Sequence, residues 1–210
     1  MMKKQLAIVL SRLKPIEDPD PDSEQYTIPG DLAAEILNLA HLAGDIEGKT
    51  VIDLGCGSGR LVIGALILGA GKAIAVDKYN AVIKTAKENV KMAEEMTSMR
   101  FSDKIEFITS DVSEAKLKGD TVIQNPPFGI QKEHSDRAFL EKALESAGKV
   151  YSLHRSYHKS RDFIQGFVEQ RKGEVGKIIK FKFRIPYMFR FHRKRAVEFD
   201  VDLFVIKKVK

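Results

Sequence analysis

The sequence has almost no cysteine, no long apolar run and no metal-binding pattern. Its single cysteine, Cys56, excludes an internal disulfide, and its five histidines do not follow metal-ligand spacing. No apolar stretch reaches the ~20 residues that a membrane-spanning helix needs, and the apolar segment after Lys3 and Lys4 is too short for a signal peptide. We therefore expect a soluble, cytoplasmic protein without a structural metal and without a membrane partner.

The composition fits one globular domain with an uneven charge distribution. The 210 residues are 43% hydrophobic, enough for a substantial core, and show no internal repeat. The formal net charge is +6, with basic residues gathered in 154–161 and 190–195 and acidic residues gathered in 17–24. This asymmetry indicates a surface that faces a polyanion and is built by the C-terminal half, while a solvated charged face is the alternative.

Strand and helix patterns alternate along most of the chain. A Pro- and Asp-rich loop or arm precedes a helix expected over 29–44, which Asp31 is placed to cap and Gly44 to end. Near-continuous apolar strands between helices predict an α/β fold, with a mostly parallel sheet covered on both faces. The expected strands are 49–54, 72–77, 104–111, 120–125 and 149–154, followed by an antiparallel pair at 174–186 and 196–207. The expected helices between them are 59–71, 79–96, 136–148 and 160–170.

A glycine-rich turn follows the first of these strands. Gly55, Gly57 and Gly59 allow close approach of a ligand to the backbone and to the amides that begin the next helix. Such a turn alone would also suit a dinucleotide or a tight structural bend. Asp77, at the end of the next strand, is placed to accept both hydroxyls of a ribose, and capping of the following helix is its alternative role.

The spelling DLGCGSG, residues 53–59, resembles the cofactor loop of class I S-adenosylmethionine methyltransferases. The resemblance implies cofactor contacts along the whole loop, including Cys56. It also implies that Asp53 orients the methionine end of the cofactor and that Asp111 accepts the adenine amino group. Both aspartates could instead be ordinary caps at strand ends.

The tetrapeptide Asn125-Pro126-Pro127-Phe128 follows the fourth strand, beside the expected position of the cofactor methyl group. A planar amino nitrogen needs hydrogen-bond acceptors because its lone pair is delocalised. The oxygens of Asn125 and Pro126 can supply them, while Pro127 stiffens the backbone and Phe128 offers a stacking surface for an unstacked base. The alternative is a Pro-Pro turn with Phe128 in the core.

Taken together, the segments 23–26, 53–59, 125–129, 136–144, 150–154 and 191–203 resemble the archaeal and eukaryotic small-subunit rRNA adenine-N6 methyltransferases. The resemblance implies a Rossmann-like fold of seven strands with the last one antiparallel. It also implies an N-terminal arm, residues 1–28, that precedes a single methyltransferase domain, residues 29–210, and brings Gln25, Tyr26 and Thr27 to the cofactor. The family has a proline after that tyrosine, whereas here Thr27 follows it directly.

The predicted activity is therefore transfer of a methyl group from S-adenosylmethionine to N6 of an adenine in structured ribosomal RNA. Alternatives are an rRNA guanine-N2 methyltransferase, a protein glutamine methyltransferase and an RNA-binding scaffold without activity. Basic side chains interleaved with aromatic rings are expected to grip RNA phosphates. This RNA-binding set comprises His154, Arg155, Lys159, Arg161, Arg193, Lys194 and Arg195. Eukaryotic family members also use a small zinc-binding activator protein, and no feature of this sequence shows whether this chain needs one.

Overall fold

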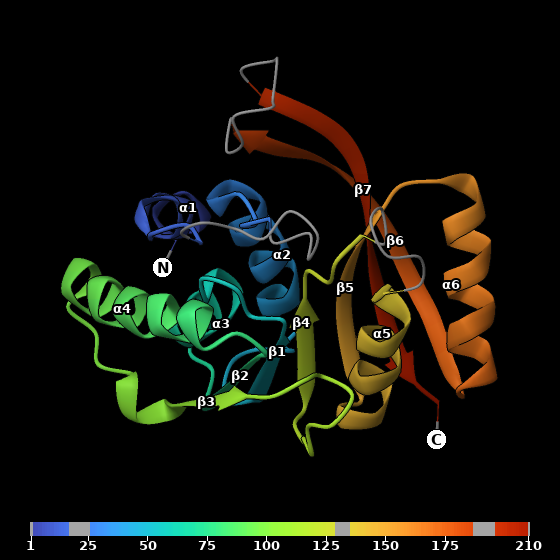
Figure 1. The fold of residues 1–210 in the computed structure, drawn as a ribbon, viewed down its shortest axis with the longest axis horizontal. Coiled ribbons are helices and arrows are strands. Elements are labelled where there is room, and N and C mark those ends of the chain that lie inside the picture. The colour runs from blue at the N-terminus through green and yellow to red at the C-terminus, as the bar shows by residue number, and fades with distance from the viewer. Residues whose placement is uncertain (1, 17–25, 129–134, 187–195, 210) are drawn as a thin grey trace.

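A mixed sheet of seven strands, in the order β3-β2-β1-β4-β5-β7-β6, forms the centre of the molecule (Figure 1). The structure is a computed structural model that describes residues 2–16, 26–128, 135–186 and 196–209. The strands are β1 (Thr50–Leu54), β2 (Lys72–Asp77), β3 (Ile105–Thr109), β4 (Thr121–Gln124), β5 (Lys149–Arg155), β6 (Gly173–Pro186) and β7 (Ala196–Lys208).

The first five strands are parallel, and β7 is antiparallel to both of its neighbours, β5 and β6. The inner parallel strands are buried almost throughout because helices cover both of their faces. The long β6–β7 ribbon rises beyond the rest of the sheet (Figure 1). This topology confirms the predicted seven-stranded α/β fold with its antiparallel last strand.

Helices divide between the two faces of the sheet (Figure 1). Two apolar clusters fill the layers between helices and sheet. One cluster packs helices α1, α2, α3 and α4 against the sheet. The other packs α5 and α6 against it. The helices are α1 (Lys3–Arg12), α2 (Gly30–Leu42), α3 (Arg60–Ile67), α4 (Asn80–Thr97), α5 (Ser135–Ser146) and α6 (His158–Gln170), with a short 3-10 turn at Ser102–Lys104. Among these described helices, none is long and apolar enough to cross a membrane.

The N-terminal segment contains a helix that the sequence analysis assigns to an arm. Helix α1 buries Leu6 and Leu10 against α2, and the close approach of the two helices requires Gly30. A Cβ atom at Gly30 would lie 2.4 Å from the backbone nitrogen of Ser11. The core therefore includes Leu6 and Leu10 of this segment.

The start of α2 also differs from the prediction that Asp31 caps it. Pro29 occupies the cap position without a side-chain hydrogen bond, and Asp31 lies inside the first turn. Its carboxylate accepts the amide of Leu32 at 2.9 Å, and its negative charge still favours the helix N-terminus. At the other end, Gly44 has a positive φ just beyond the helix, as the prediction of a glycine stop requires.

Candidate active site

The carboxyl ends of the parallel strands bring the predicted site residues to one edge of the sheet. Asp53 lies on β1, Asp77 ends β2, and Asn125 follows β4 directly. Strand β1 pairs with both β2 and β4, so these three positions come from adjacent strands. Ligands of open parallel sheets bind at this edge, next to the point where the strand order reverses.

The glycine loop between β1 and α3 folds into the conformation that its sequence predicts. Gly55, Gly57 and Gly59 all have positive φ, which side chains other than glycine rarely adopt. A Cβ atom at Gly55 would also lie 2.8 Å from the ring of Phe139, so the backbone is packed closely on that side. The amide of Cys56 donates to the carbonyl of Val76 at 2.9 Å and ties the loop to β2. The loop is thus a tight backbone turn, called the cradle below, in which the positive φ angles and the neighbouring side chains disfavour larger residues.

Asp77 connects this loop to the start of α4. One carboxylate oxygen accepts the amide of Gly57 at 3.1 Å, and the other accepts the amide of Tyr79 at 3.1 Å. Burial raises the pKa of Asp77 against the lowering effect of these hydrogen bonds. Asp77 therefore fixes the turn before α4, whose cap position is Tyr79 without a side-chain cap bond, and each oxygen retains a second lone pair with which a ribose hydroxyl could pair.

Asp53 is a buried acid with one unsatisfied oxygen. Its side chain is only 1% exposed, and one oxygen accepts the amide of Val62 at 3.2 Å. The other oxygen has no hydrogen-bond partner in the part of the chain that the structure describes. Burial, opposed by the bond from Val62 and reinforced by Asp77, raises the pKa of Asp53 to about 8. A buried acceptor without a partner fits a site that takes a donor or a cation from a ligand.

Two side chains that the sequence analysis missed hold the N-terminal segment against the cradle. Asn89 of α4 is fully buried and bonds both backbone groups of Lys14 and the carbonyl of Ser58, each at 2.9 Å. Arg60 donates to the carbonyls of Ile28 and Leu13. A lone asparagine in a helical pattern gives no signal of this role. Arg60 follows the glycine motif directly and could have been singled out.

Tyr26 and Thr27 lie near this junction. Tyr26 is partly buried against the main core, and the hydroxyl of Thr27 accepts the amide of Ile16 at 3.0 Å. Ile16 also lies next to the cradle, because its Cδ1 atom is 3.4 Å from where a Cβ of Gly57 would be. Gln25 lies outside the described residues. Thr27, which follows the tyrosine directly and not after a proline, therefore uses its hydroxyl to accept a backbone hydrogen bond from this same chain.

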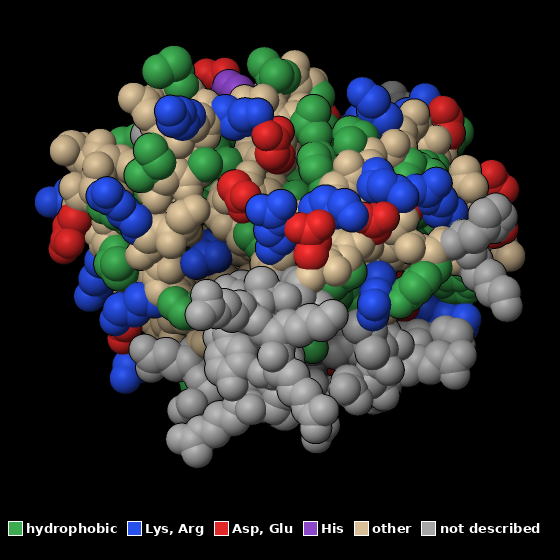
Figure 2. All heavy atoms as spheres, turned by 90° about the horizontal axis from the view of Figure 1, so that it is seen from above, with side chains coloured by type: hydrophobic (Ala, Val, Ile, Leu, Met, Phe, Trp, Pro, Cys, Tyr) green, Lys and Arg blue, Asp and Glu red, His purple; other side chains and the backbone are tan. Residues whose placement is uncertain are grey.

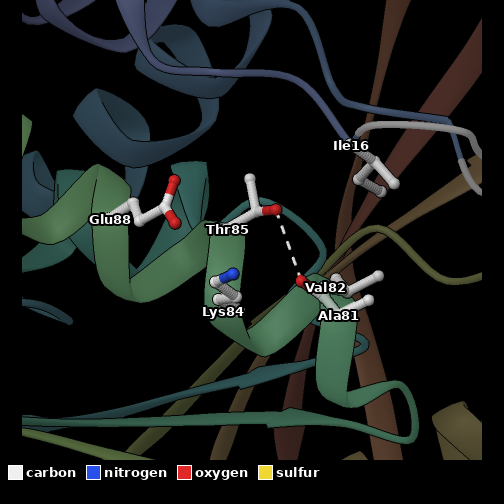
Figure 3. A pocket seen from close by; sticks show the side chains of 6 residues that line it. All are labelled: Ile16, Ala81, Val82, Lys84, Thr85 and Glu88. Carbon is white, nitrogen blue, oxygen red and sulfur yellow. Dashed lines mark hydrogen bonds between the residues drawn. The ribbon is translucent and has the colours of Figure 1, made fainter.

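A cavity of about 210 Å³ opens between Ile16 and the first turns of α4 (Figure 3). The first turns of α4 form its wall, where the hydroxyl of Thr85 donates to the carbonyl of Ala81 at 3.3 Å. The lining residues are Ile16, Ala81, Val82, Lys84, Thr85 and Glu88. None of the predicted site residues belongs to this lining, so the cavity neighbours the cradle without being part of it.

Asp111 follows β3 and is exposed. Its carboxylate accepts both the amide and the hydroxyl of Ser113, at 2.9 and 2.6 Å. Its backbone carbonyl accepts the amides of Glu114 and Ala115. These bonds are those of a strand-end cap, and the expected contact with an adenine amino group stays a prediction.

The Asn125-Pro126-Pro127-Phe128 segment presents an acceptor and a braced ring. Asn125 is partly exposed, yet its side-chain oxygen is buried and has no hydrogen-bond partner among the described residues. Pro126 is buried, while Pro127 and Phe128 are partly exposed. The ring of Phe128 stands almost perpendicular to those of Phe183 and Phe199, with centroids 5.5 Å apart in each pair. Phe128 is therefore held by the β6–β7 ribbon.

A buried polar row lies behind this segment. Gln124 donates to the hydroxyl of Ser152 at 2.9 Å, and that hydroxyl is 2.7 Å from Nε2 of His154. Nδ1 of His154 lies 3.4 Å from Asp136 at the start of α5. Burial acts to raise the pKa of Asp136, but the hydrogen bond and charge of His154 lower it overall. Gln124 at the end of β4 and Asp136 at the start of α5 both contact side chains of strand β5.

This row corrects one prediction about the RNA-facing set. The sequence places His154 on a basic surface, but the residue is only 3% exposed, and its ring stands edge-on to Phe204. Strand β5 is covered on both faces, so alternate residues do not reach solvent. In this conformation His154 cannot contact an RNA phosphate.

The remaining basic candidates differ in their surroundings. Arg161 makes two bonds, at 2.6 and 2.7 Å, to Asp202, and the guanidinium of Arg155 lies between two aromatic rings. The side chain of Lys159 and the residues Arg193, Lys194 and Arg195 lie outside the described part of the chain. Their predicted role in RNA binding stays a prediction.

The described part of the β6–β7 ribbon is not a uniformly basic surface. Lys180 and Lys182 of β6 pair with Asp200 of β7, and Arg184 pairs with Glu198. In the view of Figure 2, basic and acidic side chains are interspersed. No group of three or more potential metal ligands occurs among the described residues, and Cys56 is buried.

Comparison with known proteins identifies relatives of this chain, both in sequence and in structure. Residues 35–183 match the family described as conserved hypothetical protein 95. The rRNA N(6)-adenosine-methyltransferase METTL5 of Danio rerio is 34% identical over 96% of this chain and 97% of its own length. The uncharacterized protein MJ0284 of Methanocaldococcus jannaschii is 43% identical over 99% of this chain and 94% of its own. The crystal structure of PH1948 from Pyrococcus horikoshii superposes with a TM-score of 0.91 at 42% identity over 100% of both chains.

Proposed function

Because the chain belongs to the METTL5-like family of class I, S-adenosylmethionine-dependent rRNA N6-adenosine methyltransferases, we propose that it methylates N6 of an adenine in ribosomal RNA. The relatives in Danio rerio and Drosophila melanogaster that carry this activity in their names match most of the chain. The substrate of those proteins is the starting point of the proposal, and the site residues of this chain supply its chemistry.

The observation that carries the proposal is the buried, unpartnered oxygen of Asn125 at the end of β4. Among the described residues none bonds this oxygen, so we take it as available to accept a hydrogen from a substrate amino group. The carbonyl of Pro126 is proposed to accept the second amino hydrogen. Two fixed acceptors favour the pyramidal form of the nitrogen and direct its lone pair outward. Phe128, held by Phe183 and Phe199, is the proposed plate for the flipped base.

The cofactor site is proposed at the cradle from Asp53 to Gly59 and at Asp77. When bound, S-adenosylmethionine supplies an electrophilic methyl group on sulfur. Asp77 is proposed to accept the ribose hydroxyls, and Asp53 to meet the positively charged methionine end. The unsatisfied oxygen of Asp53 and the positive φ of the three loop glycines support this assignment. Gln25, Tyr26, Thr27 and Asp111 are proposed as further cofactor contacts.

RNA is proposed to approach over the carboxyl edge of the sheet. Arg155, Lys159, Arg161 and the basic residues 193–195 are the proposed phosphate contacts. Such charges contribute affinity that decreases as salt rises. If a zinc-binding activator protein also assists, it would meet β3 or β6, the two edges of the sheet. Co-purification of such a protein from cells tests that part separately.

The test is mass spectrometry of nucleosides from small-subunit rRNA incubated with the enzyme and isotope-labelled cofactor. We expect labelled N6-methyladenosine, and a roughly 10²-fold or greater loss of turnover in Asn125→Ala, with cofactor affinity little changed. Asn125→Asp is the matched control, because it keeps acceptor oxygens at the same position. N2-methylguanosine as the sole product, or label on protein glutamine, would refute the adenine assignment. Full activity of Asn125→Ala would refute the mechanism.

A further inference from the structure

An exposed aromatic ring lies near the proposed target site. Tyr157 is 52% exposed and stands between β5 and α6. The other exposed large hydrophobic residues described are aliphatic or methionine, so Tyr157 is the aromatic exception among them. An exposed tyrosine ring offers flat apolar area at little loss of side-chain freedom, which suits base stacking.

Tyr157 is connected to Phe128 by a continuous series of contacts. The guanidinium carbon of Arg155 lies 5.0 Å from the ring centroid of Tyr157 and 5.0 Å from that of Phe199. The ring of Phe199 in turn lies 5.5 Å from that of Phe128. Each contact has the geometry of a cation-aromatic or edge-to-face pair. A series of contacts through Arg155 and Phe199 therefore connects the exposed ring to the plate proposed for the target base.

Strand topology and local hydrogen bonds place the ring in advance of binding. Strands β4 and β5 are parallel neighbours, with Gln124 opposite Ser152, so the segments after both strands leave the same edge of the sheet. The hydroxyl of Ser160 donates to the carbonyl of Tyr157 at 2.8 Å and receives its amide at 3.3 Å. The same hydroxyl lies 3.0 Å from the carbonyl of Arg155. The turn that carries the ring is thus fixed by three contacts.

We propose that Tyr157 stacks on the nucleotide immediately next to the methylated adenine, in single-stranded RNA, with Arg155 holding the ring and facing the phosphate between the two bases. The proposal rests on the proposed function, because Phe128 defines the target position. It adds a second base-binding site to the reaction. Flipping one adenine disrupts its stacking on a neighbour, and a ring at this place would replace that lost stacking. Because all bases have a flat face, this site tolerates any base identity.

The binding test uses a short fluorescein-labelled oligouridine with one central adenine, followed by fluorescence anisotropy. Tyr157→Ala should weaken binding by about tenfold, within the usual range for one lost stacking contact. Tyr157→Phe keeps the ring and should bind within about twofold of wild type. Unchanged binding by Tyr157→Ala would overturn the proposal, and so would an equal loss in Tyr157→Phe. A thermal melt of each variant confirms that the fold is intact.

A second arm locates the contact. Oligonucleotides that carry an abasic site on one or the other side of the adenine are bound to wild type and to Tyr157→Ala. On one side, the abasic site should weaken wild-type binding by about tenfold and remove the difference between the two proteins. A full tenfold difference on both abasic RNAs would place the ring elsewhere and overturn the proposal.

The proposal and the proposed function fail in different ways. Labelled N6-methyladenosine formed without any effect of Tyr157→Ala would refute the second base site alone. A clear stacking effect without methylation of any adenine would refute the adenine activity and leave an RNA-binding site. Equal competition by double-stranded RNA would also refute the second base site, since paired bases cannot stack on Tyr157.

Discussion

Replacing the buried carboxyl of Asp53 by an amide should stabilise the ligand-free protein at high pH. Asp53→Asn keeps the size of the side chain and the oxygen that accepts the amide of Val62. It removes only the group that must lose a proton inside the core. The variant therefore isolates the electrostatic consequence of burying this acid.

The sign and size of the effect follow from the pKa of Asp53. Burial raises it from the ordinary 3.8 to about 8, so between these values the folded state binds more protons than the unfolded state. The free energy of unfolding that this group contributes in the wild type is fully present below about pH 4. It is lost as the pH rises through about 8. At about 1.4 kcal/mol per pKa unit, the ceiling is roughly 6 kcal/mol. Water penetration lowers this ceiling, and we expect roughly 2–3 kcal/mol between about pH 5 and about pH 8.

The assay is urea unfolding of both proteins at several pH values in this window, without cofactor. The free-energy difference in favour of Asp53→Asn should grow steadily with pH. Asp202→Asn is the opposite control, since burial acts to raise the pKa of Asp202 but Arg161 lowers it overall. That variant should be less stable than wild type at neutral pH, and the difference should shrink as pH falls. A stability difference for Asp53→Asn that does not vary with pH would refute the reasoning.

Three further outcomes are expected. Asp77→Ala should weaken cofactor binding at least tenfold, about 1.4 kcal/mol, because it removes the proposed ribose acceptors and loosens the loop at Gly57. Calorimetry measures this change, and an unchanged affinity would remove Asp77 from the site. His154→Phe should lower the free energy of unfolding in urea by about 1–3 kcal/mol, because it leaves buried partners unsatisfied, and wild-type stability would contradict the polar row. Gly30→Ala should lower thermal stability by about 1–3 kcal/mol, because the added methyl group overpacks α1 against α2. Gly166→Ala, on the open face of α6, is the control and should not destabilise the protein. Equal effects of the two changes would contradict the packing argument.

Much of the fold could be predicted from sequence because strand and helix periods alternate clearly in its central part. Helix α1 was accessible by the same signal, since Leu6, Val9, Leu10 and Leu13 follow a helical spacing and are all buried. Periodicity does not show what such a helix covers. Its packing depends on Gly30, which lies 18 residues beyond the end of α1, and no local pattern reports that approach.

The candidate site likewise has parts that the sequence predicts and parts that depend on contacts between distant segments. The cradle and the segment at Asn125 depend on local backbone chemistry, and the sequence predicts their places. The surface charges depend on strand register, because Lys182 lies opposite Asp200 and is neutralised there. His154 reads as a surface residue in a basic segment, but β5 is covered on both faces, and its polar side chains satisfy one another. Pairing across strands decided both cases.

The most direct test of the account is to map methylated adenines in small-subunit rRNA from cells that lack the protein. Complementation uses the wild-type gene or Asn125→Ala, with matched expression of the two proteins. The account predicts one N6-methyladenosine that disappears in the deletion, returns with wild type and stays absent with Asn125→Ala. An unchanged methylation map in the deletion, or full restoration by Asn125→Ala, would contradict it.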